Sequence, residues 1–330
     1  MVSSLDKPML PTLVSELPEG EEWRYEVKYD GYRASLLISE DRIDLVSRNL
    51  HSFNVKFPEV IEEIRSLIPQ MKHALPLRLD GELCILNSDH KADFETMQIR
   101  GRIGSERKIP IWAESHPADF AAFDILEISG DNLRSLPFLE RKQKLRELFS
   151  SLNLPLEVNH DLAASIHYVP CYENGERLWK QIKGWDSEGI IAKKTSSHWV
   201  GGKRTRNWLK IKNWKTATFF LTAYDKESDY FHVAVMREGK PFEIGLFSHG
   251  LEGDERNALI DIMRTNQTEE NARMIWIQPS ICVDLQFIEL YKEGLRQPRF
   301  KAFRLDQNWE DCTWEAVLKN VQRSILTEKQ

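Results

Sequence analysis

The chain of 330 residues is long enough for about two domains, and its 41% hydrophobic and 29% charged residues are typical of a globular protein. A net charge of −6, from 45 basic and 51 acidic residues, excludes a uniformly basic protein but allows local basic surfaces. No apolar run is long enough to span a bilayer, and the first residues lack the pattern of a secretory signal. We therefore expect a cytoplasmic protein without a membrane partner. Its four cysteines form no CxxC pair, which argues against a zinc site.

The first two thirds of the chain mix strand-like and helix-like segments after a proline-containing lead. Alternating apolar residues predict strands at 24–31, 32–39, 42–48, 75–86, 118–133 and 187–194. Apolar residues at helical spacing predict helices at 58–68, 92–103, 139–152 and 173–185. This mixture predicts an α+β domain of antiparallel sheets with helices, which we place at residues 1–213. Within it, Asp30-Gly31 between two apolar runs predicts a hairpin turn.

The pattern changes after Trp214. Short strands with turn signals are expected at 216–225, 229–239, 240–250 and within 272–294, with one helix at 253–266. Several short strands with a single intervening helix predict a small β-barrel, of which the OB-fold is one kind. We place this second domain at residues 214–330.

Charged residues stand at unexpected places in several of these segments. Lys28 interrupts a strand-like run two residues before the Asp-Gly pair, and alone it reads as a solvated residue beside a turn. Lys210 and Lys212 alternate in WLKIK, which places both on one face of a strand. The segment 201–215 has six basic residues and no acidic one, and 295–304 has four and none. Both segments predict polyanion-binding surface on an acidic protein.

The order of the segments KYDG, AFDIL, EGIIAKK, RTRNWLKIK and LRQPRFKAFRLD resembles the covalent nucleotidyltransferases, and among them the ATP-dependent DNA ligases. The segment WEDCTWE resembles the C-terminal part of bacterial end-joining ligases, so the resemblance covers most of the chain. It implies an ATP-grasp-like nucleotidyltransferase domain followed by an OB-fold domain. It also implies a DNA ligase that uses ATP and Mg²⁺ or Mn²⁺.

The resemblance implies a role for each matching residue. Lys28 would carry AMP as a lysine phosphoramidate, assisted by the catalytic residues Lys210, Lys212 and Arg304. Glu82 and Glu188 would bind the metal ion. The nucleotide site would comprise Glu26, Asp30, Gly31, Arg33, Arg48, Glu82, Phe123, Glu188, Arg204, Arg299 and Lys301. An attacking lysine must lose its proton, and we expect neighbouring cations to lower the pKa of Lys28 from its usual ~10.4.

The implied partners are nicked duplex DNA and, for an end-joining ligase, Ku and a polymerase–primase module. A monomer associated with the bacterial nucleoid is expected. Two enzyme alternatives remain open, an RNA ligase and a GTP-dependent capping guanylyltransferase. An NAD-dependent ligase is disfavoured because its usual zinc module and extra N-terminal domain have no counterpart in the sequence. The non-enzyme alternative is an OB-fold nucleic-acid-binding protein with an idle Lys28.

Overall fold

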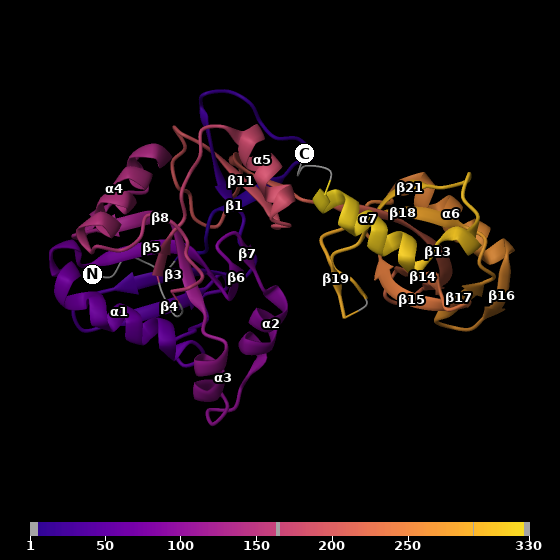
Figure 1. Ribbon diagram of the computed structural model, residues 1–330, viewed down its shortest axis with the longest axis horizontal. Helices are drawn as coiled ribbons and strands as arrows, with labels where there is room; N and C mark the ends of the chain where they lie inside the picture. The colour runs from indigo at the N-terminus through magenta and orange to yellow at the C-terminus, as the bar shows by residue number, and fades with distance from the viewer. Residues whose placement is uncertain (1–5, 163–165, 293, 327–330) are drawn as a thin grey trace. The chain divides into compact units, whose positions relative to one another are not determined.

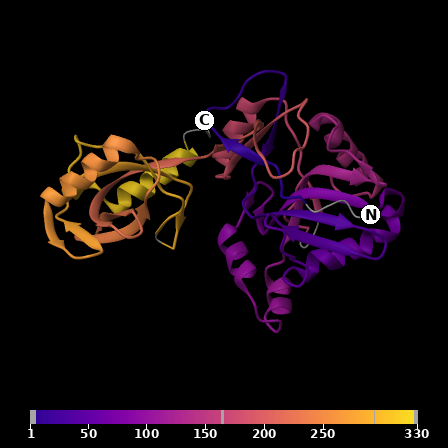
Figure 2. The same cartoon turned by 180° about the vertical axis from the view of Figure 1, so that it is seen from behind.

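The computed structural model describes residues 6–162, 166–292 and 294–326 (Figures 1 and 2). It divides into two compact units, Met1–Lys212 and Asn213–Gln330, which are described separately below. The predicted mixture of antiparallel sheets and helices is confirmed in the N-terminal unit. None of the helices in the described residues is long and apolar enough to cross a bilayer.

Two larger sheets and a short strand pair make up the β-structure described in the N-terminal unit. The first sheet has the strand order β1-β12-β11-β2, and the second has the order β10-β8-β5-β3-β4 with β9 beside β8. Neighbours are antiparallel except β1 with β12 and β10 with β8. The strands are β1 (Leu10–Leu13), β2 (Trp23–Val27), β3 (Tyr32–Ile38), β4 (Ile43–Ser47), β5 (Leu77–Cys84), β6 (Leu86–Ser88), β7 (Lys91–Ala92), β8 (Asp119–Ile128), β9 (Asp131–Asn132), β10 (Ile166–Tyr168), β11 (Gly189–Lys194) and β12 (Arg204–Lys212).

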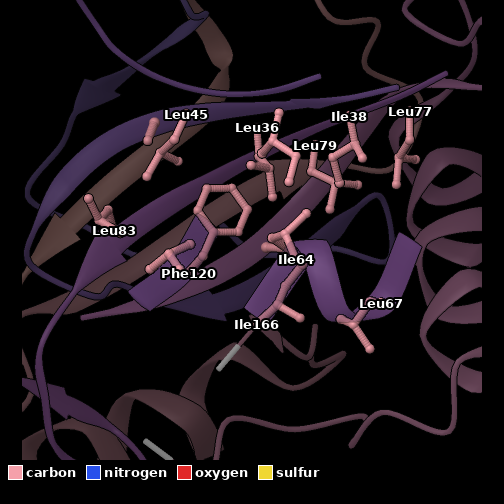
Figure 3. Close-up of a cluster of buried hydrophobic side chains, with 14 of the residues drawn as sticks. Leu36, Ile38, Leu45, Ile64, Leu67, Leu77, Leu79, Leu83, Phe120 and Ile166 are labelled. Carbon is pink, nitrogen blue, oxygen red and sulfur yellow. The ribbon is translucent and has the colours of Figure 1, made fainter. Parts of the chain in front are cut away.

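The helical segments of this unit are α1 (Pro58–Met71), the 3₁₀ turn Lys72–Ala74, α2 (Phe94–Arg102), α3 (Ile109–Ser115), α4 (Phe138–Ser151) and α5 (Gly175–Gly184). Helices α1 and α4 lie against the second sheet and bury its apolar face, whereas α5 lies against β2 and β11 of the first sheet. Proline in the first turn of α1 needs no N–H partner, and the helix then buries apolar residues every three or four positions. Figure 3 shows Ile64 and Leu67 of α1 facing Leu36, Leu79 and Phe120 of the sheet. This core fixes the strands whose ends carry the charged residues of interest.

The predicted hairpin at Asp30-Gly31 is wrong. Strand β2 pairs with β11 in the first sheet, whereas β3 pairs with β4 and β5 in the second, so residues 28–31 connect two sheets. Gly31 is needed for close packing and not for a turn, because a Cβ at this position would lie 2.2 Å from the carbonyl oxygen of Leu83. The Asp30-Gly31 dipeptide indicates that the chain changes direction, but it does not indicate which strand β2 will pair with.

The C-terminal unit is built around the long strand β13 (Lys215–Asp225), which pairs with β14, β17 and β18. Strand β18 also pairs with β21, and Arg299 of β21 forms a bridge with His249, just after β15. The other strands are β14 (Tyr230–Arg237), β15 (Lys240–Phe247), β16 (Gln267–Glu270), β17 (Met274–Ile277), β18 (Cys282–Phe287), β19 (Leu290–Tyr291), β20 (Gly294–Leu295) and β21 (Arg299–Phe303).

Three helical segments complete the C-terminal unit: α6 (Gly253–Thr265), the 3₁₀ turn Trp309–Asp311 and α7 (Trp314–Leu326). Helix α7, yellow in Figure 1, lies against β13 and β14. It was not predicted, although Trp314, Val317 and Val321 have helical spacing and pack against the core of this unit.

Candidate active site

A pocket of about 200 Å³ lies in the N-terminal unit, between the two sheets that residues 28–31 connect. Its walls come from β1, β2, β3, β5, β8, β11 and β12 and from the ends of these strands. The predicted site residues that line it are Glu26, Lys28, Arg33, Arg48, Glu82, Phe123, Arg204 and Lys210. Residues from seven strands therefore converge, although the two farthest apart in the chain, Leu10 and Lys210, are separated by 200 positions.

Lys28 lines this pocket and forms an ion pair with Glu188. The Lys28 Nζ is 2.6 Å from the Glu188 Oε2, and the Nζ of Lys212 is 3.6 Å from the Oε1 of the same carboxylate. The backbone N–H of Lys28 donates to the carbonyl of Gly189 at 2.9 Å, which fixes the lysine beside the start of β11. Glu188 and Lys212 do not line the pocket themselves but adjoin it through Lys28.

The expected lowering of the Lys28 pKa is not found. Burial favours the neutral amine, but the negative charges of Glu188, Asp30 and Glu82 outweigh it and raise the pKa of Lys28 above its usual value. The lysine is thus an ammonium at neutral pH in this arrangement. Lys210 behaves in the opposite way, because burial and the charges of Lys212, Lys28 and Arg204 lower its pKa to about 8.

Two aromatic rings line another part of the pocket. Phe123 of β8 lies edge-on to Trp208 of β12, with 6.2 Å between the ring centroids. The guanidinium of Arg33 lies 4.2 Å from the centroid of the Phe123 ring. Asp80 fixes that guanidinium through two hydrogen bonds, 2.6 Å from Nε and 2.7 Å from Nη2, and Asp80 is itself buried. An aromatic face beside a fixed cation suits a nucleobase and its ribose.

Glu26 lies in the wall next to Phe123 and is almost completely buried. Its Oε1 is 2.6 Å from the Nζ of Lys142 on α4, and its Oε2 is 2.6 Å from the Nζ of Lys193 on β11. Burial, together with the nearby charge of Lys142, lowers the pKa of Lys193 to about 8 despite the attraction of Glu26. The two ion pairs compensate the cost of burying the Glu26 carboxylate and fix its position in the wall.

The arrangement matches a known family. The family model for the ATP dependent DNA ligase domain matches residues 8–212, which is more than half of the chain and includes the whole pocket. The chain belongs to the ATP-dependent DNA ligase domain family. The N-terminal unit is thus the ligase domain that this family model describes.

Relatives of this ligase domain include longer proteins. The whole chain is 37% identical over 312 residues to the bifunctional non-homologous end joining protein LigD of Bacillus subtilis, and this match covers 94% of the chain and 51% of that protein. DNA ligase C of Mycobacterium tuberculosis is 30% identical over 220 residues, covering 66% of this chain and 57% of that protein. The chain thus spans slightly more than half the length of these relatives.

Solved structures share the fold of the ligase domain. The mycobacterial DNA ligase D complexed with ATP and MES has a TM-score of 0.54 and 22% identity, covering 93% of this chain and 98% of that one. A Lig E DNA ligase has a TM-score of 0.57 and 17% identity, covering 91% of this chain and all of that one.

Glu82 and Glu188 of the ligase domain have the chemistry of a magnesium site. Burial and the neighbouring carboxylates raise the pKa of Glu82 to about 7, and burial first, then Asp30, raises the pKa of Glu188. Crowded carboxylates of this kind are stabilised by a hard divalent cation, and Mg²⁺ needs only one or two of them because it retains several waters. In the described part of the chain no group of three or more acidic, histidine or cysteine side chains is arranged for a metal.

The predicted residues of the C-terminal unit lie on and just after β21. The Nε and Nη2 of Arg304 pair with Asp306 at 2.9 and 3.0 Å, and its Nη1 is 3.4 Å from Asp284. Arg299 stacks its guanidinium 5.9 Å from the ring centroid of Trp214, and Lys301 is exposed. These basic side chains belong to a different unit from the pocket.

Several residues of the pocket and its supports were not predicted, among them the charged residues Asp80, Lys142 and Lys193 and the aromatic residue Trp208. A signal existed for Lys142, because helical spacing places it on the same stripe as the buried residues Phe138, Leu145 and Phe149. A lysine in such a stripe predicts a buried ion pair, since an unpaired ammonium is too costly to bury. Asp80 and Trp208 carried no comparable signal, because their partners come from distant strands.

Proposed function

We propose that this chain is an ATP-dependent DNA ligase that seals nicks between a 5′-phosphate and a 3′-hydroxyl. The observation that supports this most is the position of Lys28 at the end of a pocket with a cationic end and an aromatic wall. Lys28, Lys210 and Arg204 lie at the end where a phosphate chain would fit, and Phe123 and Glu26 line the part that suits a purine. The proposed contacts with Arg33, Arg48, Asp30 and Gly31 complete the nucleotide site.

The proposed reaction proceeds in three steps that share this pocket. The neutral Lys28 amine attacks the α-phosphorus of ATP, a P–N bond forms, and pyrophosphate leaves. The AMP then passes to the 5′-phosphate of a nick, and the P–N bond breaks. Finally the 3′-hydroxyl attacks that phosphate, and AMP leaves. Lys210 and Lys212 offset the charge that develops on the α-phosphoryl oxygens.

Glu82 and Glu188 would hold Mg²⁺ or Mn²⁺ beside Lys28. When bound, the cation supplies positive charge next to the nucleotide phosphates and offsets the carboxylates that keep Lys28 protonated. The chain's own contribution is to keep Lys28 and Lys212 within ion-pair distance of Glu188, at 2.6 and 3.6 Å, with Glu82 lining the same pocket.

The C-terminal unit is proposed to be an OB-fold barrel that serves the first step. Its support is a strand circuit in which β15, β14, β13, β18 and β21 pair in sequence and His249 bridges back to Arg299. Arg299, Lys301 and Arg304 would contact the β- and γ-phosphates during adenylylation and then withdraw when DNA binds. A domain change of this kind allows one pocket to serve two substrates.

The proposed partner is nicked duplex DNA, and the end-joining name of the Bacillus relative supports a function in the repair of breaks. A Ku protein and a polymerase–primase module are proposed as assembly partners, with the chain acting as a monomer at the bacterial nucleoid. Comparing sealing of DNA ends with and without Ku tests this assignment. No stimulation by Ku would favour simple nick repair.

Labelled ATP tests the central proposal. The protein should form a covalent AMP adduct with ATP and Mg²⁺, and Lys28→Ala should abolish it while Lys72→Ala, at an exposed position, should not. Adduct formation by the Lys28→Ala variant would overturn the assignment. GTP in place of ATP separates a ligase from a capping enzyme, and nicked RNA in place of nicked DNA separates it from an RNA ligase.

A further inference from the structure

Lys142 is buried behind the nucleotide pocket and does not line it. Its side chain is 3% exposed and projects from α4 towards β2, β8 and the end of β10. The ammonium group has three hydrogen-bond donors, and the structure provides three acceptors. These are the Oε1 of Glu26, the carbonyl of Phe123 at 3.3 Å and the carbonyl of Val169.

This ammonium therefore joins the two residues that would contact the base. Glu26 is on β2 of the first sheet, and Phe123 is on β8 of the second. No strand pairing joins β2 to β8 within the described residues. Lys142 connects the Glu26 carboxylate and the Phe123 backbone through one charged group, while its ammonium also lies 4.6 Å from the centroid of the Tyr168 ring.

The Glu26 carboxylate and the Lys193 ammonium present a directional pattern to the pocket. Ionised Glu26 only accepts hydrogen bonds, and protonated Lys193 only donates. The edge of adenine carries a 6-amino donor next to an acceptor nitrogen, which matches that order. A 6-oxopurine carries an acceptor next to a donor, so its oxygen would be repelled by the carboxylate. The pattern holds only while the Glu26 carboxylate stays in the position that its two ion pairs fix.

We infer that Lys142 is a positioning residue that fixes the Glu26 carboxylate against Phe123 and thereby makes the pocket select 6-aminopurine over 6-oxopurine nucleotides. The inference rests on the proposed function, since it concerns the nucleotide that Lys28 would accept. Without Lys142, Glu26 retains only Lys193 as an ion-pair partner, and its carboxylate can rotate out of the position in which it accepts from a 6-amino group. A rotated Glu26 side chain no longer opposes a 6-oxo group, so the discrimination is lost.

The test measures adduct formation by the full chain with ATP and with ITP. Lys142→Met should lower the ratio of kcat/KM for ATP over ITP by roughly tenfold or more, mainly through KM for ATP, because one buried hydrogen-bond pattern is lost. Lys142→Arg keeps the charge and should restore part of the ratio. Glu26→Gln should move the ratio in the same direction as Lys142→Met, since its amide donates to a 6-oxo group.

Two control variants separate positioning from loss of stability. Arg100→Met removes another buried cation, which pairs with Glu59 and does not line the pocket, so it should lower stability without changing the ATP to ITP ratio. Arg146→Met removes an exposed charge from α4 and should change neither the stability nor the ATP to ITP ratio. A ratio in Lys142→Met equal to that of the wild type would overturn the inference. If Lys142→Met does not fold, an unchanged ratio in Glu26→Gln would overturn it instead.

The outcomes also separate this inference from the proposed function. A wild-type protein that forms no adduct with either nucleotide contradicts the proposed function. Calorimetric binding of AMP and IMP to the same variants then tests the purine preference without any reaction. Tighter AMP binding by the wild type that Lys142→Met abolishes would support the positioning role of Lys142, and equal binding of AMP and IMP by the wild type would overturn it.

Discussion

The ammonium of Lys28 and the carboxylate of Glu188 lie 2.6 Å apart, so the proposed nucleophile is held in a protonated ion pair. Glu188→Gln removes the charge that contributes most to raising the Lys28 pKa. We expect that pKa to fall by about 1 to 3 pH units, as is usual for the loss of a close opposite charge. The pH dependence of Lys28 acylation by an amine-directed reagent, followed by mass spectrometry without added metal, measures the change.

The exposed residue Glu62 on α1 provides the control for that experiment. Glu62→Gln should leave the acylation profile of Lys28 unchanged. A Glu188→Gln variant with the profile of the wild type would show that Glu188 does not determine the protonation of Lys28.

Lys210 should cost the protein stability at neutral pH. Its pKa of about 8 in the folded protein lies below the usual ~10.4. The folded state therefore carries an unfavourable charge that is fully present below pH 8 and disappears as the pH rises to ~10.4. Lys210→Met should stabilise the fold by about 1 kcal/mol more at pH 7 than at pH ~10.4, while slowing adduct formation.

Denaturant unfolding of Lys210→Met and wild type at the two pH values measures this difference. If methionine stabilised the fold only by better packing, the stabilisation would be the same at both pH values. Such a pH-independent result would contradict the electrostatic explanation.

Gly189 should tolerate no side chain. Its φ of +153° is unfavourable for other residues, and a Cβ there would lie 2.0 Å from the carbonyl oxygen of Ile211 on the neighbouring strand. Gly189→Ala should therefore lower the free energy of unfolding by roughly 2 kcal/mol or more and displace the adjacent Glu188. Gly184→Ala, at the end of α5 with no atom near the new Cβ, should be neutral or slightly stabilising. Equal effects of the two substitutions on the midpoint of denaturant unfolding would contradict this explanation.

Arg304 should affect the first step of the reaction more than the last. If it contacts the leaving pyrophosphate, Arg304→Ala should slow adenylylation by roughly a hundredfold and slow sealing of a preadenylylated nick much less. Asp306→Ala frees the guanidinium from its paired acid and should preserve adenylylation. Rapid-quench measurement of the two steps distinguishes them. Equal slowing of both steps by Arg304→Ala would remove its specific first-step role.

Most of the residues that line the pocket are predictable from the order of the charged motifs along the chain. Lys28, Glu82, Phe123 and Lys210 are brought together at one pocket, and their convergence follows from strand ends that meet between two sheets. The resemblance to the ligases supplies this set, because single residues such as Phe123 read as ordinary core positions when taken alone.

Other features were not predictable because they depend on pairing between distant strands. The Asp30-Gly31 signal is local, whereas the separation of β2 from β3 is decided by the pairing of β2 with β11, more than 160 residues later. The protonation of Lys28 likewise depends on how close Glu188, Asp30 and Glu82 lie to its ammonium group. A list of nearby cations and anions gives the sign of a pKa change only after the distances are known.

The connection between β2 and β3 is anchored at both ends, by the hydrogen bond from Lys28 to Gly189 in one sheet and by the packing of Gly31 on Leu83 in the other. The backbone of the nucleophile is therefore positioned by two separate layers of the domain at once. Chimaeric proteins that take one sheet from a homologue and retain the other should misplace Lys28 even when every motif residue is preserved. Both sheets must come from the same protein for Lys28 to remain where the nucleotide can reach it.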